Sequence, residues 1–247
     1  MLRLITWNVN GLEERAIGRR MEKLCLEVLV GGDLRAALEG RATRPAPDLI
    51  AFQEMTRHTW AVMRGHLAAG GYRCWPEGPR EREDWSMLAV RAPWSFEEVA
   101  LRAFEESPLA REAVVATVAH PDGRVLRWMT AHLESLRSGG EARLAQAREI
   151  DGWLAEAGPP GIFAGDTNLR RGEWETLAAG GFRARDAFEL AGRPAKARHT
   201  WVHEGSRRGF RFDRVWLGTG WRLMDFALRD AGWASDHRGV ECAVEPP

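Results

Sequence analysis

The chain has 247 residues, and its 35 lysines and arginines balance its 35 aspartates and glutamates, so the formal net charge is zero. This balance excludes a protein-wide basic surface, and any site for a polyanion such as nucleic acid must therefore be local. An apolar fraction of 45% and a charged fraction of 28% are ordinary for a globular protein and exclude disorder as the overall state.

The first predicted strand covers residues 2–9 and ends at polar side chains. Apolar and polar residues alternate along it and stop at Asn10, which is followed by glycine, a pattern typical of a strand that enters a turn. Asn8 lies near the strand end, where it is either a functional group or the cap of the next helix. That helix, predicted over residues 13–30, is amphipathic and structural.

A second buried strand is predicted over residues 48–53, after a Gly-, Arg- and Pro-rich passage at 31–47 that indicates a loop insertion. Glu54 ends this strand. Because Mg²⁺ takes oxygen ligands and needs only one or two protein carboxylates, Glu54 is a candidate ligand, although a lone glutamate at a strand end is more often solvated. His58 and His66 follow on a predicted helix and are interpreted as surface or packing residues.

Short strand candidates then follow one another and predict an antiparallel meander, which favours mixed sheets over a doubly wound parallel sheet. These candidates are residues 72–75, 86–90, 98–103, 113–119 and 125–132. The last of them ends at His132, with Ser135 and Arg137 close behind. The three side chains together could hold phosphate oxygens, although each one singly is more often a loop residue.

The strand predicted over residues 161–166 ends in Asp166, Thr167 and Asn168, after an amphipathic helix at 141–157. Layered α/β proteins place their chemistry at strand ends. If the extended backbone continues, Asp166 and Asn168 point to the same side, where a carboxylate and an amide can orient a water and accept its proton. The alternative is a turn in which both side chains bond their own backbone.

A further strand, over residues 209–217, holds Asp213 among apolar neighbours, and a buried aspartate usually needs a partner. Asp236 and His237 form the last polar group before the final strand at 240–244. We expect Asp213 to fix the tautomer of His237 and raise its basicity, as in other histidines oriented by a carboxylate. Trp201 is either a platform for a base or a core residue.

The three cysteines, Cys25, Cys74 and Cys242, are odd in number and widely spaced. They indicate neither a disulfide framework nor a cysteine-rich metal site, and they favour a reducing compartment. The first strand leaves no room for a signal peptide, and no apolar run is long enough to span a bilayer. We therefore expect a cytoplasmic protein with no membrane partner, folded as a single domain over residues 1–247.

Polar groups at five strand ends in one domain are hard to explain as independent turns. The set resembles the endonuclease/exonuclease/phosphatase superfamily of metal-dependent phosphoesterases, in motif order and over nearly the whole chain. The motifs that carry the resemblance are residues 6–12 (TWNVNGL), 53–54 (QE), 132–135 (HLES), 165–168 (GDTN), 212–214 (FDR) and 235–237 (SDH).

This resemblance implies an α/β fold, a four-layer α/β/β/α sandwich with two mixed, largely antiparallel β-sheets, and a catalytic role for the polar strand ends. Asp166 would activate the attacking water, and Asn168 would position it. His132, and His237 held by Asp213, would stabilise the phosphorane. The metal ligands implied are Glu54, Asp236 and Asn8, and the cofactor is Mg²⁺, for which Mn²⁺ could substitute.

The nearer resemblance within the superfamily is to the tyrosyl-DNA phosphodiesterase 2 subfamily, which removes tyrosine adducts from DNA 5′ ends. It rests on Arg137 after the HLES motif, on Arg170 after GDTN and on Arg211 before FDR. The substrate-binding residues that the resemblance implies are Asn10, Ser135, Arg137, Arg170, Trp201 and Phe212. Two departures are Asn10, where the subfamily has an acidic residue, and a shorter segment between Trp201 and Phe212.

The implied function is hydrolysis of a phosphoester at a nucleic-acid 5′ end, with a 5′-phosphotyrosyl-DNA bond as the leading substrate. The partner is then nucleic acid, a single-stranded 5′ end of DNA, and no obligate protein partner is inferred. Two alternatives stay open from the residues alone. One is a general nuclease or a phosphoesterase for a small molecule or lipid, and the other is an inactive module that binds nucleic acid or protein.

Overall fold

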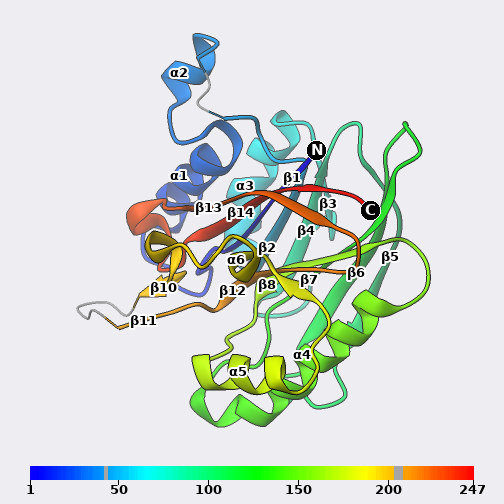
Figure 1. Ribbon diagram of the computed structural model, residues 1–247. Coiled ribbons are helices and arrows are strands. Elements are labelled where there is room, and N and C mark those ends of the chain that lie inside the picture. Colours follow the sequence, from blue (N-terminus) through cyan, green and yellow to red (C-terminus); the bar gives the residue numbers. More distant parts are fainter. Residues whose placement is uncertain (42–43, 203–207) are drawn as a thin grey trace.

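The computed structural model of the protein describes residues 1–41, 44–202 and 208–247. Two six-stranded mixed sheets lie face to face in it, with helices on both outer sides (Figure 1). Residues 42–43 and 203–207 lie outside the described parts of the chain. They fall in the expected loop insertion at 31–47 and in the shortened segment between Trp201 and Phe212.

The first sheet has the strand order β13-β14-β1-β2-β4-β3. Strands β1 and β2 are parallel, and the other neighbours are antiparallel. Its strands are β1 (Leu2–Asn8), β2 (Leu49–Met55), β3 (Tyr72–Trp75), β4 (Trp85–Arg91), β13 (Arg222–Arg229) and β14 (Gly239–Glu245).

The second sheet has the order β5-β6-β7-β8-β12-β9, and again only its central pair, β7 and β8, is parallel. Its strands are β5 (Ser95–Ala103), β6 (Glu112–Ala119), β7 (Val125–Ala131), β8 (Gly161–Asp166), β9 (Arg185–Asp186) and β12 (Asp213–Leu217). A separate short pair, β10 (Trp201–Val202) and β11 (Gly209–Phe210), lies beside it.

The helices divide between the two outer faces. Helices α1 (Ile17–Val30) and α3 (Arg57–Ala69) cover the first sheet, and α4 (Gly140–Ala155) and α5 (Arg171–Ala179) cover the second (Figure 1). Shorter helical segments are α2 (Leu34–Leu38), α6 (Ala187–Leu190) and three 3₁₀ turns, η1 (Arg137–Gly139), η2 (Ala195–Ala197) and η3 (Gly232–Ala234). Among the described helices, none combines the length and apolar character that crossing a bilayer requires.

The core lies in three layers that follow the two-residue period of the strands. Leu4 of β1 and Ile162 of β8 face each other between the sheets, whereas Ile5 packs under α1 and α3 and Phe163 packs under α4. Each sheet is therefore apolar on both faces, and this is possible only because the helices cover the outer ones. The expected four-layer α/β/β/α sandwich with mixed sheets is confirmed.

The prediction that all five short strands form one meander is wrong, because they divide between the two sheets. Residues 72–91 form β3 and β4, which pair with each other and with β2 in the first sheet, and only β5, β6 and β7 form a meander in the second. Strand β4 is buried on both faces because it lies between the α3 layer and the inter-sheet core. Apolar alternation predicts a strand but does not specify its sheet. The helix expected from residue 13 begins at Ile17.

Close approach of β7 and β8 gives a test of this packing. A Cβ atom on Gly165 would collide with the carbonyl oxygen of Ala131 and lie 3.0 Å from the Phe163 ring. We expect Gly165→Ala to lower the free energy of unfolding by ~1–3 kcal/mol, the usual cost of overpacking. The measurement is urea unfolding followed by circular dichroism.

Gly152→Ala in α4 is the matched control, because no atom lies within 4 Å of its added Cβ. In a helix interior this change should raise stability by roughly 0.5–1 kcal/mol. Equal stabilities for the two variants would contradict the tight contact between β7 and β8.

Candidate active site

The polar side chains meet at one edge of the inter-sheet space because they continue the inner faces of their strands. Asn8 lies four residues after Leu4, and Asp166 lies two residues after Ala164, so both keep the orientation of a core residue. Asp213 begins β12 directly opposite Asp166 in the antiparallel register. His132 follows β7 and forms a bridge with Asp166. The strands that give the sheets their core thus also bring these four groups together.

Asn8 connects the two sheets through its side-chain amide. Its Nδ2 donates to Oε1 of Glu54 at 2.9 Å and to Oδ2 of Asp166 at 2.8 Å, and the side chain is fully buried. Its Oδ1 accepts from the backbone N–H of Asn10. Because α1 begins only at Ile17, the alternative that Asn8 caps a helix is wrong.

Glu54 reaches Asn8 through an irregular backbone. Its neighbour Gln53 faces the inter-sheet space and donates to Thr130 of the other sheet, so a regular strand would turn Glu54 outward. The pairing of β2 with β4 is interrupted between Phe52 and Met55, and Glu54 has a φ of 55°. Such an irregularity re-aims a side chain, and left-handed backbone at a residue other than glycine is typical of functional sites.

Asp166 is almost fully buried and is surrounded by donors. Its Oδ2 lies 3.6 Å from Nε2 of His132 and 3.8 Å from Nε2 of His237. Burial raises the pKa of Asp166. The two imidazoles and the Asn8 amide together lower it by more, so the pKa of Asp166 lies below its usual value. Asp166 is therefore an ionised acceptor at neutral pH.

Asn168 does not continue the strand. Its φ is 50°, its backbone N–H donates to Oδ1 of Asp166 at 2.9 Å, and its Nδ2 donates to the carbonyl of Leu133 at 3.2 Å. The expectation of an extended backbone through Asn168 is wrong, because Asp166 closes an Asx-type turn with it. The side chain of Asn168 instead joins the segment after β8 to the segment after β7.

Asp213 and His237 form the expected pair. Nδ1 of His237 and Oδ2 of Asp213 are 2.8 Å apart, and both residues are buried. Burial lowers the pKa of His237, but the facing Asp213 carboxylate and the more distant Asp166 raise it to about 10. Burial also raises the pKa of Asp213. The pair therefore retains a proton over a wide range of pH.

Asp84 is a site residue that the sequence predictions missed. Its Oδ2 lies 3.8 Å from Nδ1 of His132 and accepts from Nη1 of Arg111 at 3.0 Å. Burial raises the pKa of Asp84, but His132 and Arg111 lower it below the usual value. Asp84 immediately precedes β4, which runs antiparallel to β2, so the start of β4 lies at the edge where β2 ends. The antiparallel pairing of β4 with β2 is the feature from which the position of Asp84 could have been predicted.

Asp236 is turned toward the aromatic residues rather than into the buried cluster. Its Oδ2 accepts from Nε1 of Trp201 at 2.7 Å, and it is exposed. Within the described residues, no hydrogen bond joins Asp236 to Glu54 or Asn8. The group at 235–237 also precedes β14 and does not end a strand.

Aromatic side chains extend from the site toward β10 and β11. The Phe212 ring lies 5.6 Å from Trp201 and 6.5 Å from His237, and it stacks on Phe210 at 5.1 Å with an interplanar angle of 4°. These distances connect the short strand pair directly to the edge of the sheets where His237 lies.

The three predicted phosphate-binding side chains lie on two adjacent segments. Ser135 is half-buried and Arg137 is exposed, both in the segment after β7. Arg170 ends the segment after β8, and its Nη1 lies 3.5 Å from the carbonyl of Leu136. Asn10 lies apart from them, at the β1 end, where the buried Arg20 holds its carbonyl at 2.7 Å. The sequence did not predict the burial of Arg20, because an arginine on an amphipathic helix ordinarily faces water.

The oxygen donors at this edge suit a hard divalent cation. Two carboxylates, Glu54 and Asp166, converge on one amide, and like charges this close in a buried site favour a cation between them. Ligand atoms of Asp166, Asp213 and His237 also lie within 4.8 Å of one another. The nitrogen of His237 nearest Asp213 is already hydrogen-bonded to it, so this second group fits a proton-holding pair better than a metal site.

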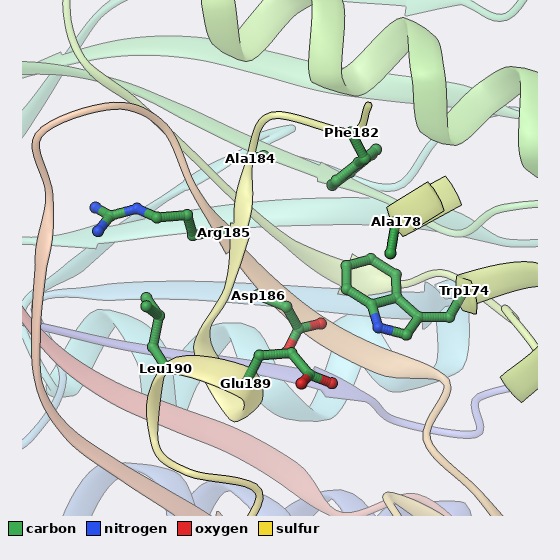
Figure 2. A pocket seen from close by; sticks show the side chains of 8 residues that line it. All are labelled: Trp174, Ala178, Phe182, Ala184, Arg185, Asp186, Glu189 and Leu190. Carbon is green, nitrogen blue, oxygen red and sulfur yellow. The ribbon is translucent and has the colours of Figure 1, made fainter. Parts of the chain in front are cut away.

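Two cavities differ in their relation to the site. One of about 340 Å³ is lined by residues close in sequence to Asn10, Glu54 and Asp84, and it therefore opens beside the candidate site. Its lining residues are Gly11, Leu12, Glu14, Thr56, Arg57, His58, Arg82 and Glu83. The other, of about 320 Å³, lies between α5 and α6 and contains none of the predicted site residues (Figure 2). Its Asp186 is held by Arg214 at 2.8 Å.

Comparisons with known proteins agree with this geometry. The model of the endonuclease/exonuclease/phosphatase family matches residues 5–241. Tyrosyl-DNA phosphodiesterase 2 of Bos taurus is 26% identical in an alignment of 265 residues that covers 98% of this chain and 67% of that protein. The Gallus gallus enzyme of the same name is 26% identical over 98% of this chain and 66% of its own length. The chain thus spans about two thirds of these relatives.

Solved structures give the same picture. The chain is similar to Danio rerio tyrosyl-DNA phosphodiesterase 2 in complex with a single-stranded DNA product, with a TM-score of 0.82 and 26% identity over 99% of this chain and 98% of that one. It shares its fold with a mannosyl-6-phosphatase of Bacteroides thetaiotaomicron, with a TM-score of 0.71 and 16% identity over 99% of this chain and all of that one.

The Asp213–His237 pair predicts a pH dependence. The folded-state pKa of His237, about 10, is above its unfolded value of 6.5, so the stabilisation from this pair is complete below pH 6.5 and is lost as pH rises through about 10. In chelator-treated protein, we expect NMR titration of the His237 ring to show it protonated well above pH 7. Asp213→Asn should lower this pKa sharply, because burial then dominates. A wild-type midpoint near 6.5 would contradict the pairing.

Proposed function

The chain belongs to the endonuclease/exonuclease/phosphatase family, and from this premise we propose that it is a Mg²⁺-dependent phosphodiesterase that hydrolyses 5′-phosphotyrosyl bonds at DNA ends. One observation carries the proposal. The buried amide of Asn8 joins the carboxylates of Glu54 and Asp166, and two histidine rings face Asp166 within 4 Å. The whole of residues 1–247 would act as one catalytic domain, since the site draws on both ends of the chain.

Asp166 accepts the proton of the attacking water in this proposal. It is ionised, its Oδ1 accepts from the backbone of Asn168, and its Oδ2 accepts from Asn8 and also faces the two histidines. In this proposal Asn168 also positions the water with its side-chain amide, which Leu133 holds in place through Nδ2. General-base assistance of this kind requires the carboxylate within hydrogen-bond reach of the water, and fixed partners maintain that geometry.

The two histidines stabilise the charge that develops on the phosphorane. His237 is held protonated by Asp213, and its Nε2 points at the Asp166 side of the site. Asp84 faces the other nitrogen of His132 and orients this second ring. Fixed donors aimed at developing charge lower the barrier more than they stabilise the ground state.

Glu54 and Asn8 would hold the divalent cation, with Asp236 acting through water. A bound Mg²⁺ would supply charge neutralisation at the phosphate oxygens and at the leaving oxygen. The oxygen-only donor set supports Mg²⁺, with Mn²⁺ as a substitute, over softer metals. A tyrosine leaving group has a pKa near 10, so its departure depends less on a protein acid than that of a sugar alkoxide would.

The substrate proposal rests on the relatives and on the surroundings of the site. The relatives are named tyrosyl-DNA phosphodiesterase 2, and one similar structure holds single-stranded DNA product. In this chain, Ser135, Arg137 and Arg170 would bind phosphates, and Trp201 and Phe212 would stack on bases. Asn10 would contact the substrate at the cavity beside Glu54. No protein partner is required.

We also propose that the protein works in the cytoplasm. All three cysteines are free in the structure, and two of them are buried. Free cysteines are typical of proteins from a reducing compartment.

The first test compares substrates. The purified protein is offered a 5′-phosphotyrosyl oligonucleotide, an unmodified single strand and a small phosphodiester, each with Mg²⁺ or with chelator. We expect the first to be turned over fastest and the chelator to abolish turnover. Faster turnover of either other substrate would favour a general nuclease or a small-molecule phosphoesterase.

Asp166→Asn tests the mechanism in the same assay. Loss of a general base should lower kcat by ~10²–10⁴-fold. Asp122→Asn is the matched control, because Asp122 lies in the exposed turn between β6 and β7, at the opposite end of β7 from His132. Full activity in Asp166→Asn would rule out the proposed mechanism.

Asp84→Asn tests the newly found partner of His132. We expect kcat to fall by about 10–100-fold, the range for carboxylates that orient a functional histidine. The change keeps the size of the side chain but removes the negative charge that lies 3.8 Å from Nδ1 of His132. Unchanged kcat, with the variant folded by circular dichroism, would show that Asp84 only packs against Arg111.

A further inference from the structure

Arg143 is a fully buried charge that the proposed chemistry does not use. It lies on α4, and its Nη1 donates to the carbonyls of Glu134, Ser135 and Leu136, at 3.0 Å for the first and 2.7 Å for the last. Its Nε and Nη2 donate to the two carboxylate oxygens of Glu173 at 3.1 and 2.7 Å. The planar guanidinium therefore holds two different targets at once, which a lysine cannot do.

Glu173 extends this connection to the segment after β8. It lies in the first turn of α5, and its Oε2 accepts from the backbone N–H of Arg170 at 2.9 Å. The Arg143 side chain is fully buried and the Glu173 side chain is mostly buried, so water has little access to this ion pair. Burial raises the pKa of Glu173, but the hydrogen bond and charge of Arg143 help to hold it below its usual value. One ion pair thus ties together residues 134–136 and residue 170.

The segment after β7 is shaped around this arginine. Three successive carbonyls turn inward to one cation, and Leu136 has a φ of 22° and a side chain that is 66% exposed. Few residues other than glycine adopt such a backbone without compensation. Gly139 is also close, since an added Cβ would lie 3.1 Å from Nη1 of Arg143. Ser135 and Arg137, on either side of Leu136, are positioned by this conformation.

We propose that the Arg143–Glu173 ion pair is a positioning device that locks the two phosphate-binding segments to each other and so sets affinity for the DNA strand beyond the reacting phosphate. It rests on the proposed function, because Ser135, Arg137 and Arg170 are assigned to that strand. Neither Arg143 nor Glu173 touches the Asp166 carboxylate in any hydrogen bond of the described residues. The pair therefore acts on binding and leaves the chemical step unchanged.

Glu173→Gln is the test, because it keeps the size of the side chain and removes its charge. For the 5′-phosphotyrosyl oligonucleotide, we expect KM to rise about 10-fold, the effect of losing one charge-assisted hydrogen bond, with kcat within about 2-fold of wild type. For a 5′-phosphotyrosyl mononucleotide, which has no further phosphates, kcat/KM should be unchanged. Arg143→Lys, which keeps the charge and loses the fork, should show the same split.

Glu175→Gln is the matched control on the same helix. Glu175 pairs with Arg171 at 2.8 Å, but both side chains are mostly exposed, and such pairs contribute little. It should behave as wild type with both substrates. Circular dichroism and thermal melting establish that each variant is folded at the assay temperature.

Two outcomes would overturn the proposal. One is a Glu173→Gln variant that matches Glu175→Gln with the oligonucleotide, and the other is an equal loss of kcat with both substrates. If wild-type protein does not hydrolyse the phosphotyrosyl bond at all, the proposed function fails separately. Fluorescence anisotropy with a 5′-phosphorylated single strand then decides on the ion pair, since weaker binding by Glu173→Gln supports it and equal binding overturns it.

Discussion

The structure depends on one buried amide at the edge where the two sheets meet. Asn8 belongs to the first sheet and Asp166 to the second, and the Nδ2 of Asn8 donates to Asp166 and to Glu54. Two carboxylates held this close in a buried site repel each other unless donors or a cation lie between them. The amide supplies the donors, and the same unbalanced charge makes this edge attractive to a divalent cation. The packing of the two inner sheet faces therefore also determines the electrostatics of the site, because it places Asn8 against both carboxylates.

Each histidine of the site faces one carboxylate behind it and Asp166 in front. His237 has Asp213 at 2.8 Å, and His132 has Asp84 at 3.8 Å, whereas their Nε2 atoms lie 3.8 and 3.6 Å from Asp166. The two pairs differ in strength, because only the first makes a direct hydrogen bond. The Asp213 carboxylate therefore holds the His237 ring directly, whereas Asp84 faces the His132 ring across a longer distance.

Much of the site could be predicted from the sequence because apolar runs mark strand ends. Asn8, His132 and Asp166 follow such runs, and the buried position of Asp213 implied a partner that proved to be His237. The orientation of Glu54 could not be predicted, since it depends on an irregular pairing between β2 and β4. Asp84 could not be predicted from the strand ends either, because it lies directly before the start of β4.

Other features escaped prediction because they depend on tertiary packing. The short strands divide between the two sheets according to their tertiary packing. The alternation of apolar and polar residues predicts that each is a strand but does not show to which sheet it belongs. Arg20 and Arg143 lie on amphipathic helices where an arginine ordinarily faces water, yet both are buried and hold backbone carbonyls beside the site.

The central claim is that this edge of the sheets binds a divalent cation, and the most direct measurement of it is anomalous diffraction from crystals soaked in Mn²⁺. We expect the anomalous peak beside Glu54, within reach of Asn8 and Asp166, whereas a peak between Asp213 and His237, or none at this edge, would contradict the assignment.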